Sequence, residues 1–188
     1  MKKIVAALLL SSAAASAFAA DQGFYAGVTL GQSRASNPFP TLTVTKSTDT
    51  VYGILGGYQI TKNFGAEAFF TGAGKFAVSN AFGSATGKAD SYGINAVGTL
   101  PLSDAFSLYG KLGFASTKTT ASSTPASVTG ATRTGATYGL GGVYNATPAI
   151  GIRFGWDRYA AAVANGTAIG SKDNYNTDVY SVGAVFKF

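Results

Sequence analysis

The stretch "GGYQITKNFGAEAFF", residues 56–70, places two short alternating segments on either side of a turn. In the second segment Ala66, Ala68 and Phe70 are apolar, whereas the charged Glu67 stands between them. Successive side chains of a β-strand point to opposite faces, so the charge and the apolar side chains lie on different faces. The stretch predicts a β-hairpin with one apolar face and one face that carries charge.

The same arrangement returns in "GGVYNATPAIGIRFG", residues 141–155, where Arg153 stands between Ile152 and Phe154. Two-residue alternation recurs along the chain after Asp21, whereas a helical period does not. The pattern predicts eight strands, over residues 23–32, 50–60, 64–73, 91–101, 105–116, 135–145, 149–159 and 177–188.

The charged residues in the interiors of the predicted strands lie on the same one of the two strand faces. Bulky apolar side chains such as Phe24, Ile94 and Leu140 gather on the opposite face, and no charge interrupts them. The face with the charges also holds Tyr25, Tyr109 and many glycines and threonines. The charges on it are Glu67, Lys111, Arg153, Asp157 and Lys187, and the apolar exceptions on it are Leu55, Phe69, Val97 and Val143.

The predicted connections alternate in length. Short turns are expected at "ITKNFG", "LPLSDA" and "NATPA", which contain turn-forming residues. Long polar connections are expected at about residues 34–49, 74–90, 117–134 and 160–176. Eight antiparallel strands joined in this way form an up-and-down meander.

Two closed meanders fit this pattern, and they differ in which face is inside. A soluble lipocalin-like barrel encloses the apolar side chains, whereas a membrane barrel turns them toward lipid. The interior of eight strands is only wide enough for a few side chains, so the many bulky residues do not fit there. Only 12% of the residues are charged, against about 25% in soluble domains. The sequence therefore predicts an all-β fold, an eight-stranded antiparallel up-and-down transmembrane β-barrel.

The chain begins "MKKIVAALLLSSAAASAFAA". Two lysines, a short apolar run and a small-residue segment ending in Ala-Phe-Ala are typical of a secretory signal peptide. We expect residues 1–19 to be removed and residues 20–188 to form the barrel domain. Removal of Lys2 and Lys3 lowers the formal charge from +6 to +4. The remaining basic residues are scattered, so no nucleic-acid site is expected.

The sequence resembles the small OmpA/OmpX-like outer-membrane β-barrel proteins. The likeness rests on "GFYAGVTLGQS" (23–33), "GGYQITKNFGAEAFF", "GIRFGWDRY" (151–159) and "SVGAVFKF" (181–188). It implies export to a Gram-negative outer membrane, insertion by the outer-membrane assembly machinery with periplasmic chaperones, and surroundings of lipid and lipopolysaccharide. The final stretch resembles the family's assembly signal, whose fixed positions fall on Ser181, Gly183, Phe186 and Phe188.

The resemblance also bears on the lumen. Glu67 and Arg153 match positions that hold an ion-paired core in the family, whereas Val97 and Val143 stand where its members tend to have further charged partners. Parity places Glu67, Lys111, Arg153 and Asp157 in the lumen, as a plug or as a gated pore, and buried charges need partners. Glu67 with Arg153 is the expected pair, because both lie near the start of predicted strands that leave the same short-turn side of the barrel.

Catalysis and metal binding have little support in the sequence. The chain has no histidine and no cysteine, which removes the usual general base and the commonest zinc ligands. We therefore expect no catalytic residue, no cofactor and no metal. The leading hypothesis is a non-enzymatic outer-membrane protein for envelope structure and surface-loop display, including adhesion or host contact. The alternative is a narrow channel for ions or small solutes. The sequence does not identify a partner for the loops.

Overall fold

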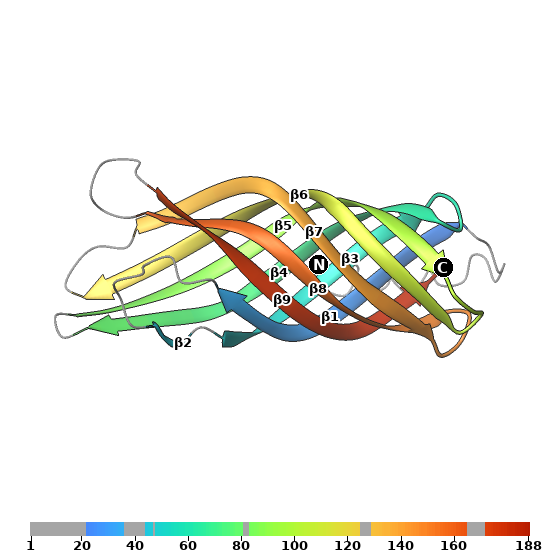
Figure 1. The fold of residues 1–188 in the computed structure, drawn as a ribbon, viewed down its shortest axis with the longest axis horizontal. Helices are drawn as coiled ribbons and strands as arrows, with labels where there is room; N and C mark the ends of the chain where they lie inside the picture. Colours follow the sequence, from blue (N-terminus) through green and yellow to red (C-terminus); the bar gives the residue numbers. More distant parts are fainter. Residues whose placement is uncertain (1–21, 36–43, 47, 81–82, 125–128, 165–171) are drawn as a thin grey trace, which may run out of the picture.

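The computed structural model describes residues 22–35, 44–46, 48–80, 83–124, 129–164 and 172–188. Regular structure in these ranges consists of nine strands, wound obliquely around a long axis (Figure 1). The strands are β1 (Gly23–Ala35), β2 (Val44–Lys46), β3 (Thr48–Gln59), β4 (Phe64–Asn80), β5 (Gly83–Pro101), β6 (Phe106–Thr124), β7 (Thr129–Asn145), β8 (Ile150–Ala164) and β9 (Lys172–Lys187). Among the residues described, no helix is long and apolar enough to cross a bilayer.

Eight of the strands close into a barrel. Each strand pairs antiparallel with its neighbours in the order β4, β3, β1, β9, β8, β7, β6, β5, and a further pairing of β5 with β4 completes the circle. This closure confirms the predicted fold class. The three-residue strand β2, which pairs with the distal part of β4 at Val78 and Ala77, is an addition that the alternation did not indicate.

The three short turns repeat one hydrogen-bonding device. A hydroxyl oxygen accepts a bond from the backbone N–H three residues later, from Phe64 to Thr61 Oγ1 (3.1 Å), from Phe106 to Ser103 Oγ (3.1 Å) and from Ile150 to Thr147 Oγ1 (3.0 Å). Local bonds of this kind favour turns over continued strand. These turns define the short-turn end of the barrel, and the opposite end is called the long-connection end.

The predicted connections at the long-connection end are too long. Residues 74–80 and 83–90, expected in a connection, pair in register from Lys75 with Lys88 to Asn80 with Gly83. Likewise β6 reaches Thr124 and β7 begins at Thr129. A membrane crossing needs only ~9–11 residues, whereas β5 and β6 have 19 each. The segment that extends β6, residues 117–124, is rich in threonine, a residue type that suits strands.

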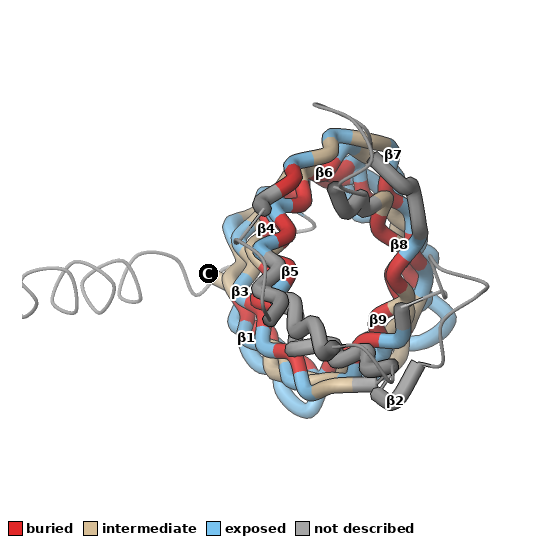
Figure 2. The backbone as a smooth tube through the Cα atoms, turned by 90° about the vertical axis from the view of Figure 1, so that its left-hand side faces the viewer, coloured by how far each residue is buried: buried red, intermediate tan, exposed pale blue. Residues whose placement is uncertain are grey.

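The two faces of the barrel have the predicted polarity. Buried residues line the inside of the ring and exposed residues its outside (Figure 2). On the outside Phe24 and Ile94 are each 67% exposed, while Glu67 on the inside is 2% exposed. An apolar surface of this extent marks contact with membrane or protein rather than with water. The soluble-barrel alternative, which encloses the apolar face, is therefore wrong.

The four apolar exceptions lie on the lumen side. Phe69 and Val97 are buried there, and Leu55 packs against a buried cluster. Val143 is half-buried and pairs with Arg153 across β7 and β8. Side chains fill the interior of an eight-stranded barrel, so an apolar side chain can pack there without facing water.

Candidate functional site

The four charged residues predicted for the lumen meet in one network. Glu67 projects from β4, Lys111 from β6, and Arg153 and Asp157 from β8. Arg153 donates two hydrogen bonds to Glu67, from Nη1 to Oε2 (2.5 Å) and from Nη2 to Oε1 (3.3 Å). Lys111 Nζ lies 2.9 Å from Asp157 Oδ1 and 3.6 Å from Glu67 Oε1. The structure thus forms the expected pair of Glu67 with Arg153 and joins it to the other two charges.

This network is buried and electrically balanced. The Glu67 side chain is fully buried, and those of Lys111, Arg153 and Asp157 are each 7% exposed. Two carboxylates and two cations alternate along the chain of contacts, so every charge has an opposite neighbour. An isolated charge at such a position would carry a large desolvation cost, which pairing and hydrogen bonding offset.

Two tyrosines complete the network, and the sequence analysis did not include them among the site residues. Tyr25 on β1 donates a hydrogen bond to Glu67 Oε2 at 3.2 Å. The ring of Tyr109 on β6 lies beneath the Arg153 guanidinium, 4.1 Å from its centroid, and the Tyr109 hydroxyl donates to the carbonyl of Phe154. Both tyrosines stand on the strand face that carries the charges, so the alternation of side chains already indicated that they point into the lumen.

An apolar layer covers the network toward the long-connection end. Its buried members are Val51, Phe69, Ala115, Tyr159 and Val179, and Leu55 packs against them. Phe69 lies two residues beyond Glu67 on β4, Tyr159 lies two beyond Asp157 on β8, and their ring centroids are 5.5 Å apart. The cavity between the two layers measures about 20 Å³, which is room for about one water molecule.

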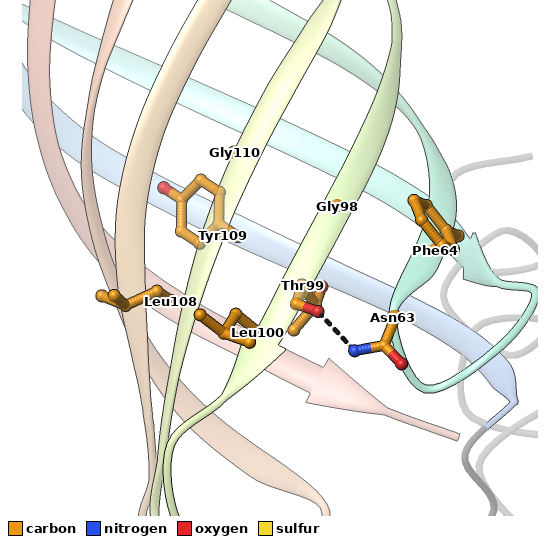
Figure 3. Close-up of a pocket in the computed structure, with 8 residues that line it drawn as sticks. All are labelled: Asn63, Phe64, Gly98, Thr99, Leu100, Leu108, Tyr109 and Gly110. Atoms are coloured by element: carbon orange, nitrogen blue, oxygen red, sulfur yellow. Dashed lines mark hydrogen bonds between the residues drawn. The ribbon is translucent and has the colours of Figure 1, made fainter.

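A separate hollow of about 380 Å³ opens on the outer wall near the short-turn end (Figure 3). It lies where Gly98 on β5 pairs with Gly110 on β6, so that no side chain covers the backbone there. Phe64 and Leu100 border it, and the Asn63 side chain donates to the Thr99 carbonyl at its edge. No carboxylate, amine or guanidinium is among its lining residues.

Three of the four predicted assembly-signal residues lie on β9, the strand that closes the barrel against β1, and the fourth, Phe188, directly follows it. Ser181 pairs with Gly31, Gly183 with Thr29 and Phe186 with Ala26. The backbone N–H of Phe188 donates to the carbonyl of Phe24 at 2.9 Å. Their position at the seam is a structural fact, and their role in assembly stays a prediction.

The family comparison agrees with this geometry. The model of the outer membrane protein beta-barrel domain matches residues 5–188. The chain belongs to this family. That membership confirms the resemblance to small outer-membrane barrels, while comparison with curated proteins gives no match.

Solved barrels of this family type share the fold at low sequence identity. Neisserial surface protein A is 18% identical, with a TM-score of 0.66 over 88% of this chain and 97% of that one. Ail, the attachment invasion locus protein of Yersinia pestis, is 16% identical, with a TM-score of 0.55 over 90% and 99%. OprG from Pseudomonas aeruginosa is 19% identical, with a TM-score of 0.57 over 90% and 96%. At these identities the likeness extends to the fold alone.

Proposed function

We propose that this outer-membrane barrel is a closed, non-enzymatic structural protein that holds its strand ends outside the cell. The observation that carries the proposal is the filled lumen, in which a balanced ion network and an apolar layer leave about 20 Å³ between them. An ion crossing this lumen would have to separate paired charges and pass an apolar constriction, which itself opposes water.

A narrow channel for ions or small solutes is the second candidate. The observation in its favour is the position of Lys111, which lies within ion-pair distance of both Asp157 and Glu67. A lumen can rearrange without leaving a charge unpaired if its two cations exchange partners together, and Lys111 already lies near both carboxylates. The apolar layer above the network does not take part in such an exchange, and it favours the closed barrel.

Surface display by the long-connection end of the barrel is also part of the proposal. Strands β4 to β7 continue beyond the length that lipid requires, and they do so at the long-connection end. In outer-membrane barrels the short turns face the periplasm and the longer connections face outward. We infer that this projecting end contacts the host or another external surface. The structural likeness to Ail, whose name refers to attachment and invasion, supports this inference.

Export and assembly complete the proposal. Residues 1–19, predicted as a signal peptide, lie outside the described residues. We infer that the chain reaches the outer membrane through periplasmic chaperones and the assembly machinery, and that lipid and lipopolysaccharide surround it there. Family membership supports this route.

Single-cysteine labelling on intact cells tests the proposed orientation, and the chain has no cysteine of its own. Thr120, exposed on the long-connection half of β6, and Ser103, exposed in a short turn, are matched positions. We expect a membrane-impermeant maleimide to label Thr120→Cys on intact cells and Ser103→Cys only after permeabilisation. Labelling of Ser103→Cys alone on intact cells would reverse the orientation and remove the basis for surface display.

A further inference from the structure

Outward charges on the barrel wall lie toward the long-connection end, wherever the strand side chains are described. They are four cations and two carboxylates, whereas Lys62 and Asp104 stand in the short turns at the other end. The outward charges form two groups on different sides of the barrel, namely Arg34, Arg158 and Asp178 on β1, β8 and β9, and Lys88, Asp90 and Lys118 on β5 and β6.

In the first group the charges stand in one row across neighbouring strands. Arg158 on β8 pairs in register with Asp178 on β9, and Asp178 pairs with Arg34 on β1. Arg158 binds Asp178 through two hydrogen bonds, from Nε to Oδ1 (2.7 Å) and from Nη2 to Oδ2 (2.8 Å). The indole N–H of Trp156 donates to the same carboxylate at 3.1 Å. One carboxylate therefore stands between two guanidinium groups.

Arg34 is the member of this row that has no hydrogen-bond partner among the described residues. It is exposed and lies in the electrostatic field of the Asp178 carboxylate. Its guanidinium retains free N–H donors at the edge of the apolar belt, and the row carries a net charge of one unit positive. A guanidinium at such a position suits a phosphate, which it can bind through two parallel bonds.

An apolar groove begins directly beside this row. It measures about 610 Å³ and opens on the outside of the barrel. The next two rows of outward side chains border it, with Trp156 and Tyr180 on the side of the charges and Phe154 and Val182 on the far side. Its lining runs from Leu30 on β1 to Leu140 on β7 and Leu108 on β6. Charge, aromatic ring and aliphatic side chain thus follow one another in the order in which a lipid presents its headgroup, interface and chain.

We propose that this place binds an anionic membrane lipid, with its phosphate on Arg34 and an acyl chain in the groove. The proposal rests on the outer-membrane position of the barrel but not on its closed lumen. Charge complementarity selects a headgroup with net negative charge over a zwitterionic one, whose phosphate is balanced by its own cation, since each basic residue near a membrane surface favours anionic lipid.

The second group of charges supplies a matched control. Lys88 Nζ lies 3.3 Å from Asp90, and Asp90 pairs in register with Lys118, so this group also has two cations around one carboxylate. The adjacent outward row there holds Tyr92, Ser116 and Thr134, and the last two hydrogen-bond to each other. The described groove with its aliphatic lining lies beside the first group and not beside this one.

The site contains its own reporter, because Trp156 is the chain's single tryptophan. The full barrel is reconstituted in phosphatidylcholine vesicles that contain brominated phosphatidic acid or brominated phosphatidylcholine, and quenching of Trp156 gives the relative binding constant of the two lipids. We expect phosphatidic acid to be favoured about fivefold. Arg34→Ala should bring the ratio close to one, whereas Lys118→Ala should leave it unchanged.

A second pair of variants tests the groove. Val182 and Val28 are both outward and both 55% exposed, but only Val182 lines the groove. Val182→Phe should lower quenching by brominated phosphatidic acid, and Val28→Phe should not. Equal quenching by both lipids in the unmodified protein, or an equal loss in Arg34→Ala and Lys118→Ala, would overturn the proposal. So would a cross-linked dimer that shields Trp156 from both lipids. An open lumen would change none of these ratios, so this test and the test of the closed barrel fail independently.

Discussion

Arg153→Ala is expected to lower the free energy of unfolding by about 3–5 kcal/mol, the usual cost of leaving a buried charge without its partner. Arg153 donates one hydrogen bond to each of the two carboxylate oxygens of Glu67. Without it Glu67 retains Tyr25 at 3.2 Å and Lys111 at 3.6 Å, and it stays buried between the apolar layer and the tyrosines. Unfolding in urea from lipid vesicles, followed by Trp156 fluorescence, measures the change.

The double variant Glu67→Gln with Arg153→Met separates the unpaired charge from lost packing. It removes both charges and leaves the Lys111–Asp157 pair in place, so it should be more stable than Arg153→Ala alone. Lys118→Ala on the outside should change the unfolding free energy by less than about 0.5 kcal/mol. A change in Arg153→Ala no larger than that of Lys118→Ala would show that water enters the lumen freely.

Gly183→Val is expected to prevent closure of the barrel in most molecules. A Cβ at position 183 would overlap the carbonyl oxygen of Val28 and lie 2.8 Å from the Thr29 Cα, both on the strand that β9 must join. Overpacking of this kind costs about 1–3 kcal/mol or more, and here the backbones can separate only by breaking the seam. Loss of the heat-modifiable folded band on a gel, and reduced protein in the outer membrane, measure the effect.

Gly110→Val is the matched control for the seam. Gly110 faces outward on β6, and a Cβ there would have nothing within 4 Å. The same exchange of glycine for valine should therefore leave folding and membrane levels intact. If both variants assemble equally well, the close approach of β9 to β1 is not what makes Gly183 necessary, and its place in the predicted assembly signal loses its physical basis.

The alternation of side chains predicted most of the barrel because lipid favours apolar side chains, whereas the lumen of this barrel holds polar and small ones, at alternate positions along each strand. The alternation around Glu67 and Arg153 was sufficient to assign both to the interior. Their similar positions near the starts of two strands that leave the same end of the barrel predicted a similar depth. Closure followed from the membrane itself, since an open sheet edge in lipid leaves backbone groups unsatisfied.

The features that the sequence did not predict lie where contact with lipid does not decide which residue types are favoured. Beyond the apolar belt, residues such as Lys75 and Lys88 continue the strand pairing although a membrane crossing does not require it. The strand ends predicted from the loss of apolar alternation therefore lie too close to the belt. Within the lumen, parity shows that Phe69 faces inward but not how deep it lies. The apolar layer formed by Phe69 and Tyr159 depends on the stagger between strands, which one sequence does not reveal.

Single-channel recording of the unmodified protein in a planar lipid bilayer tests the central claim, that its own side chains close the lumen. We expect no steady conductance, because the network of Glu67, Lys111, Arg153 and Asp157 and the apolar layer above it leave about 20 Å³. Arg153→Ala, recorded in the same way, should show openings if water enters the space that it leaves. A large, steady conductance in the unmodified protein that Arg153→Ala does not change would contradict the closed barrel and make the protein a channel.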